Sequence, residues 1–355
     1  MRLPAIQKKA FVLTCLVVAL VWTAGCSFLV GSEESESTPP APFQLNYIET
    51  LRNQESLRGE SFQEIPRGSV SAPFLQRPSA VYADQYRVYV ADSFLQPPAI
   101  SSARVFVFER GSLTATLVNI SPSPDGPLLA PAGIAVDASG VIYLSDKQQG
   151  RVVGFDRNGA LVTVLGRPQS PLTSRGGLAD LSAPGSLAFD NARNILYVAD
   201  TRAHQVKAFN SLGAHLFDLG NSGRSEEDFK FPAGLAVDRN GNVYVLDSFR
   251  LRVFIFNEQG KYNRNFSLKG AVPGQSIRPS GLGVDSDGHI YVTDEVNSNI
   301  LIFNPDGSLV LTWGRTGRLS GDFWTPTAIF IDSQNYIYIA DQTNSRVQTF
   351  QYTRQ

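Results

Sequence analysis

The chain has 355 residues, of which 43% are hydrophobic and 18% are charged, and its formal net charge at pH 7 is -1. This length provides a core for one large domain or for two ordinary ones. Nucleic-acid-binding domains are usually basic, so the nearly neutral balance argues against a general nucleic-acid partner.

Residues 1–25 have the pattern of a secretory signal peptide. Basic residues precede the apolar run 11–21, which is short for a permanent membrane span. The end of the segment, 23–26, resembles the bacterial lipoprotein signal, although Thr23 stands where Leu is usual. This resemblance implies cleavage before Cys26 and lipidation of that cysteine. An ordinary secretory signal that is cut at a nearby small residue is the alternative.

Lipidation of Cys26 has consequences for chemistry and location. Cleavage also removes Cys15, so the mature chain would have no thiol for catalysis, metal binding or a disulfide. The expected location is extracytoplasmic and lipid-anchored to a bacterial membrane, and Ser27 favours the outer membrane in a Gram-negative host. Residues 26–42 are acidic and rich in Ser and Pro, which predicts a disordered tether.

From residue 78 onward, one phrase of sequence occurs six times. Each copy has a Pro, a short apolar run that ends in Asp, a turn, a run that contains Tyr and ends in a second Asp, and a third apolar run. The six copies begin at Pro78, Pro131, Pro184, Pro232, Pro279 and Pro326. The runs are too short for ordinary helices and rich in β-branched and aromatic residues, which predicts strands. A Gly turn and a fourth strand follow copies two to five.

Four antiparallel strands in each of six repeats predict an all-β fold, a six-bladed β-propeller with blades over residues 75–355. The first strand of each blade is expected to line the crowded axis, because it consists of small and β-branched residues. The last copy ends at Gln355 without a fourth strand, which would leave unpaired edge groups. Residues 43–51 alternate suitably and are predicted to close the last blade, so the propeller domain spans 43–355.

The repeats resemble the NHL-repeat family of six-bladed propellers. The last copy has the family-like arrangement of Asp341, Asn344, Arg346 and Val347. Copies three and five depart from it, with Gln205 and Asn299 in place of the Arg, and His204 stands at the family's His position.

Candidate binding residues lie in loops that are expected to surround the central funnel. Loops on a rigid scaffold often carry binding sites, and aromatic and Arg side chains are typical anchors. The candidates are Phe94, Arg202, Phe249, Arg250, Glu295 and Trp324. The alternative is that they are ordinary solvated or packed loop residues.

The most regular polar feature is an Asp at the end of each second strand. The six residues are Asp92, Asp146, Asp200, Asp247, Asp294 and Asp341. They could bind a cation around the funnel, but a structural role is favoured, in which each carboxylate accepts backbone N–H groups. Where an Arg stands five residues later, the carboxylate could also pair with it.

Three histidines, His204, His215 and His289, occupy different parts of their repeats and are not expected to form a zinc site. We assign no catalytic residue, metal or cofactor from the sequence. A calcium ion bound in the funnel is the alternative that is left open. We expect a non-enzymatic, membrane-anchored scaffold that binds another envelope protein or a ligand. The alternative is a propeller enzyme, a metal-dependent lactonase-like hydrolase or a lyase, that acts at the funnel.

Overall fold

The computed structural model divides the chain into two units, Met1–Pro42 and Phe43–Gln355. It describes residues 44–51, 75–96, 100–111, 115–118, 120, 126–166, 180–220 and 228–353. The expected signal peptide, Cys26 and the tether lie outside these residues. Within the described ranges, no helix is long and apolar enough to cross a membrane.

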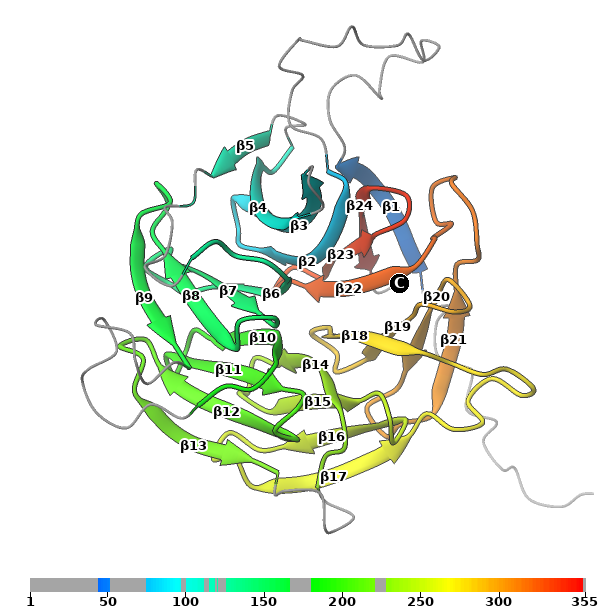
Figure 1. Ribbon diagram of the computed structural model, residues 1–355. Helices are drawn as coiled ribbons and strands as arrows, with labels where there is room; N and C mark the ends of the chain where they lie inside the picture. Colours follow the sequence, from blue (N-terminus) through cyan, green and yellow to red (C-terminus); the bar gives the residue numbers. More distant parts are fainter. Residues whose placement is uncertain are drawn as a thin grey trace, which may run out of the picture. The chain divides into compact units, whose positions relative to one another are not determined.

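The described part of the second unit consists of six four-stranded antiparallel sheets, and each sheet is one blade of a propeller (Figure 1). The first three blades contain β2 (Arg77–Ala83), β3 (Arg87–Gln96), β4 (Ile100–Glu109) and β5 (Ala115–Val118); β6 (Pro131–Val136), β7 (Ile142–Asp146), β8 (Arg151–Phe155) and β9 (Leu161–Leu165); and β10 (Pro184–Asp190), β11 (Ile195–Asp200), β12 (Gln205–Asn210) and β13 (His215–Leu219).

The other three blades follow the same order from the axis outward. They contain β14 (Pro232–Val237), β15 (Val243–Asp247), β16 (Arg252–Phe256) and β17 (Tyr262–Ser267); β18 (Pro279–Val284), β19 (Ile290–Asp294), β20 (Asn299–Phe303) and β21 (Leu309–Trp313); and β22 (Pro326–Ile331), β23 (Tyr336–Asp341), β24 (Arg346–Thr353) and β1 (Gln44–Leu51). The six-bladed all-β fold predicted from the repeats is therefore confirmed.

The first strands of the blades crowd together at the axis. A Cβ atom added to Gly133 in β6 would lie 2.4 Å from the carbonyl O of Gly185 in β10. One added to Gly281 in β18 would lie 3.0 Å from the Cα of Ala328 in β22. Real Cβ atoms do not approach backbone at the first of these distances, so Gly133 allows the neighbouring inner strands to converge.

The middle strands form the core between blades. Every residue of β7, β8, β19 and β20 is buried. Large aromatic side chains fill the space that widens away from the axis, and Tyr143 of the second blade stacks on Phe189 of the third at 5.8 Å. The outer strands are less buried, as in β21.

The last blade is closed by the N-terminal strand of the propeller unit. β1 pairs with β24, and Leu45 lies opposite Tyr352 while Leu51 lies opposite Val347 (Figure 1). The Tyr47 ring contacts the edge of Phe350, with centroids 5.5 Å apart. This pairing satisfies the edge of β24 and confirms the predicted closure of the ring.

The sequence of residues 93–103, which contains Phe94, predicts one of the candidate loops, but the structure differs there. The ladder between β3 and β4 continues to the pair Gln96 and Ile100, so most of this segment belongs to a long hairpin. The Pro pair at 97–98 obscured the strand pattern on either side of it.

Candidate functional site

A central pocket of about 690 Å³ lies along the propeller axis. Its wall comes from the first strand of every blade, and its mouth comes from the turns that connect the first strand of each blade to the second. The beginning of each inner strand contributes small side chains, among them Ser79, Ser280 and Thr327. A pocket of this size and position can hold a small molecule or an inserted segment of a protein.

The wall becomes apolar towards the mouth. Tyr82 of β2 and Phe330 of β22 contact each other with ring centroids 4.6 Å apart. Val237, Val284 and Ile331 line the same part of the pocket and are partly accessible. Burial raises the pKa of Tyr82, so its hydroxyl stays neutral at ordinary pH. This part of the pocket therefore offers a hydrophobic surface with one neutral hydroxyl group.

Polar side chains reach across the mouth between blades that are not neighbours. The Arg239 guanidinium of the fourth blade donates a hydrogen bond to the carbonyl O of Ser333 in the sixth. The Asn191 amide of the third blade donates one to the Tyr82 hydroxyl of the first, at 3.4 Å. A ligand that enters from this end would meet these groups first.

The mouth residues share one position of the repeat, directly after the Asp that ends the first strand. That position holds Gln85, Ala138, Asn191, Arg239, Ser286 and Ser333, which all line the pocket. The sequence-based choice of candidates missed them. Variation at this position, beside an invariant Asp, was the signal that could have found them.

The Asp residues of these turns hold the turns in shape. Asp137 Oδ1 accepts the backbone N–H groups of Ser139 and Val141, both at 2.9 Å. The Tyr143 hydroxyl donates to Asp137 Oδ2 at 3.2 Å, and burial and then this carboxylate raise the pKa of Tyr143. These carboxylate oxygens are therefore occupied by local donors.

The third blade departs from this pattern. Arg193 Nη1 donates to Asp190 Oδ2 at 3.0 Å and occupies the oxygen that a Tyr takes in the second blade. Within the described residues, the hydroxyl of Tyr197 has no hydrogen-bond partner. Burial, followed by the negative charge of Asp190, raises the pKa of Tyr197 to about 12.

At the opposite end of the ring, the Asp residues after the second strands are buried and structural. Asp92 Oδ1 accepts the backbone N–H groups of Gln76 and Arg77 at 2.9 and 2.7 Å. Its Oδ2 accepts a hydrogen bond from Arg104 Nη2 at 2.5 Å. Burial raises the pKa of Asp92, and Arg104 opposes that shift. The structural role expected for these carboxylates is confirmed, with the preceding loop as a further source of N–H groups.

The expected pairing with an Arg five residues later holds in two blades. Arg151 lies 3.7 Å from Asp146, and Arg346 lies 2.7 Å from Asp341. In the fourth blade, Arg252 Nη1 instead donates to Asn265 Oδ1 at 3.1 Å.

Arg252 lines a second, shallow hollow of about 300 Å³. We call it the basic hollow; its lining residues are Lys230, Phe249, Arg250, Arg252 and Lys269.

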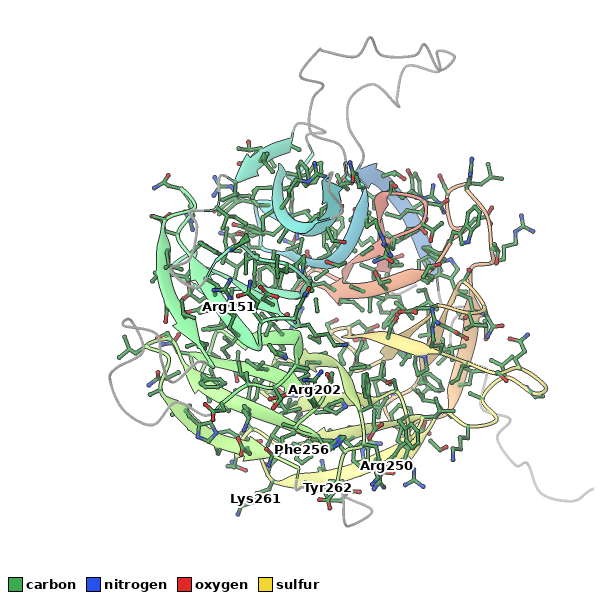
Figure 2. All side chains as sticks on the ribbon, in the orientation of Figure 1. Arg151, Arg202, Arg250, Phe256, Lys261 and Tyr262 are labelled. Carbon is green, nitrogen blue, oxygen red and sulfur yellow. The ribbon has the colours of Figure 1, made fainter. Side chains whose placement is uncertain are left out.

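The five loop candidates whose side chains the structure describes do not line the central pocket. Phe249 and Arg250 belong to the basic hollow, and Figure 2 places Arg250 nearer the outer edge of the ring than Arg202. Glu295 forms a salt bridge with Arg278 at 2.6 Å, and the Trp324 ring lies 5.7 Å from the Arg318 guanidinium. The side chain of Phe94 lies outside the described residues. A contact with a ligand stays a prediction for all six.

The histidines lie apart, and each has a local partner. His204 Nδ1 contacts the carbonyl O of Lys230 at 2.5 Å. His215 lies 2.6 Å from Asp218, and His289 lies 2.8 Å from Asp285. Among the residues that the structure describes, no group of three or more His, Cys, Asp or Glu side chains could hold a metal ion.

Comparison with known families identifies two parts of the chain. Residues 229–256 match the NHL repeat, and residues 284–355 match a six-bladed β-propeller family. A curated relative, NHL repeat-containing protein 2 of Gallus gallus, is 31% identical over 108 residues. That match covers 29% of this chain and 15% of the relative, so this chain spans only a small part of the relative's length.

Similar solved structures share the fold at low sequence identity. Virginiamycin B lyase from Staphylococcus aureus has a TM-score of 0.54 and 11% identity, over 87% of this chain and 99% of the lyase. A protein of unknown function from Bacteroides thetaiotaomicron has a TM-score of 0.58 and 17% identity, over 88% of this chain and 77% of that protein. Together with the six repeated blades, these matches identify the chain as a six-bladed β-propeller, part of which matches the NHL repeat.

Proposed function

We propose that this protein is a lipid-anchored, extracytoplasmic binding scaffold whose central pocket receives an apolar segment of another envelope protein. The observation that carries the proposal is the pocket of about 690 Å³, with Tyr82 and Phe330 in its wall and Arg239 across its mouth. An apolar wall with a few polar groups at the entrance is typical of binding sites.

The structural roles of the polar side chains also favour a binding function over an enzymatic one. The repeated Asp residues at both ends of the ring accept hydrogen bonds from backbone N–H groups, as Asp137 and Asp92 illustrate. His289, near the mouth, is held by Asp285 at 2.8 Å. The groups that most often perform acid–base chemistry therefore have structural partners in this part of the chain.

The anchoring part of the proposal rests on the sequence before the propeller. An apolar run followed by a small-residue motif and Cys26 is the pattern of a lipoprotein signal. Intact-mass analysis of the membrane fraction should give a mature chain that begins at a lipidated Cys26. The Cys26→Ala variant should lose the lipid, and a wild-type chain that is released into the soluble fraction without lipid would contradict the anchor.

Site-specific photo-cross-linking in the source cells tests the pocket. A photoreactive residue at Gln85, which is exposed at the mouth, should give one discrete cross-linked protein. The matched control is the same residue at Leu212, which is 88% exposed in an outer turn. Equal labelling from both positions, or no protein adduct from Gln85, would refute binding at this mouth.

The alternative is an enzyme that acts on a small molecule in the same pocket. Metal analysis of the purified full chain separates the two ideas, because a metal-dependent hydrolase or lyase requires a divalent ion. A stoichiometric divalent ion in the purified chain, together with no adduct from Gln85, would favour the enzyme.

A further inference from the structure

We propose that the basic hollow in the fourth blade binds a phosphate-bearing group. Four cationic side chains and one aromatic ring line it: Lys230, Arg250, Arg252, Lys269 and Phe249. No carboxylate contributes to its described lining. Several positive charges around one concavity attract an anion, and phosphate oxygens accept hydrogen bonds from Arg and Lys.

Arg252 provides the first argument, because it has left the role that its repeat position has elsewhere. In the second and sixth blades, the corresponding Arg151 and Arg346 are buried and lie beside the Asp of their own blade. Arg252 is half-buried, bonds Asn265 and lines the hollow. Its guanidinium therefore lies at the surface of the blade rather than in its interior.

Asp247 provides the second argument, because its carboxylate is bonded by the backbone of the loops that surround the hollow. It is buried, and its Oδ1 accepts the backbone N–H groups of Phe231, Phe249 and Arg250. Its Oδ2 accepts the backbone N–H of Lys230 at 2.5 Å. With both oxygens used by the backbone, Asp247 holds the loops that carry the cationic side chains around the hollow.

Phe249 and Lys269 indicate the kind of ligand. Phe249 is 75% exposed at the hollow, a high value for a large apolar side chain. Lys269 is also exposed and lines the same hollow. Cations beside an exposed ring suit an organic phosphate, whose charged group meets Arg252 and Lys269 while its carbon part meets Phe249.

The basic hollow is separate from the central pocket. It is formed by loops at the end of the ring opposite the mouth that contains Arg239, and the two sites share no lining residue. Failure of one proposal therefore leaves the other untouched.

Calorimetric titration of the full chain, purified in detergent, tests the proposal with three probes: inorganic phosphate, glycerol phosphate and dihexanoyl phosphatidylglycerol. We expect binding of at least one probe, with Arg252→Gln or Lys269→Gln weakening it about tenfold or more. Arg252→Gln introduces the residue type that the third blade has at this position, Gln205, so the fold should persist. Phe249→Ala should weaken the two organic probes more than inorganic phosphate.

The matched control is Lys261→Gln, which removes an exposed charge from the same blade outside the hollow (Figure 2). Binding of phosphatidylglycerol without inorganic phosphate would identify a lipid headgroup as the source, and the reverse result would identify free phosphate. Equal weakening by Lys261→Gln would overturn the proposal. So would the absence of binding by all three probes, or Arg252-dependent binding of polyglutamate in their place.

Discussion

Closure of the ring by β1 can be tested with two substitutions in the same strand. Leu51 is 1% exposed and belongs to a core cluster with Val88, Phe106 and Val347. Ile48 is 43% exposed and lies at the irregularity in the register with β24. Leu51→Ala and Ile48→Ala each shorten an aliphatic side chain, but only the first removes a contact that fixes β1 to the ring.

The burial of the two side chains sets the expected magnitudes. Replacing a fully buried Leu with Ala costs about 2–5 kcal/mol of unfolding free energy. For a domain of about 310 residues, an unfolding entropy of about 2.1 cal/mol/K per residue converts this cost into a fall of roughly 3–8 °C in Tm. Ile48→Ala should cost less than about 1 kcal/mol, because its side chain stays largely in water.

Thermal and urea denaturation of the two variants and the wild type measure the difference. Deletion of residues 44–51 should lower Tm further than Leu51→Ala, because it also leaves the edge of β24 unpaired and uncovers Phe350. Equal melting temperatures for Leu51→Ala and Ile48→Ala, or an unchanged melting curve after the deletion, would refute closure by β1.

Four further predictions concern the interior of the propeller. Gly133→Ala should destabilise the fold by about 1–3 kcal/mol more than Gly185→Ala in urea titrations, because its Cβ would meet backbone at 2.4 Å while that of Gly185 would meet its nearest atom at 3.4 Å. Arg346→Met should cost about 3–5 kcal/mol, because it leaves the buried Asp341 without its cation. Tyr143→Phe should cost about 1–2 kcal/mol by loss of a hydrogen bond to Asp137, whereas Tyr197→Phe should be nearly neutral. The pKa of Tyr197 is about 12 in the folded state, above the ordinary value of about 10. Its contribution to stability is therefore complete below about pH 10 and falls away as pH rises towards 12, which tyrosinate absorbance and urea midpoints can follow together.

Each of these predictions has an outcome that contradicts it. Equal effects of the two Gly substitutions would mean that the inner strands can separate without cost. Arg315→Gln is the control for Arg346→Met, because Arg315 forms an exposed ion pair with Asp322 and should change stability by less than about 1 kcal/mol. A Tyr197→Phe variant with the wild-type loss of stability above pH 10 would assign that loss to other tyrosines.

The repetition in the sequence was sufficient to predict the fold. Six copies of an Asp–turn–Tyr phrase predict six similar turns, and four blades form the same Tyr–Asp hydrogen bond, as the Asp137–Tyr143 pair shows. In the third and sixth blades an Arg side chain bonds the Asp instead. Closure by β1 could also be predicted, because an unpaired edge on the last blade requires a strand from elsewhere. The extended β3–β4 hairpin was missed because its Pro pair looks like a loop signal.

The sites could be predicted only in part, because they depend on contacts between distant residues. Arg239 and Ser333 are 94 positions apart, and only the closed ring brings them to one mouth. Arg252 and Arg346 have the same place in their repeats, yet Arg346 is surrounded by the carbonyl groups of Arg318, Leu319 and Asp322. Those acceptors come from an irregular loop whose path the repeat pattern does not specify.

Recognition on a ring of six similar blades has to come from positions at which the blades differ. A residue present in every blade performs the same task six times, and the Asp residues at both ends are used in this way for turns and loops. A ligand or partner without sixfold symmetry must contact residues that one blade has and its neighbours lack. Arg239 at the mouth and Arg252 in the basic hollow are such residues. This reasoning places function at the irregular positions of the repeat, and it explains why substitution of a repeated Asp should lower stability while substitution of Arg239 or Arg252 should change binding.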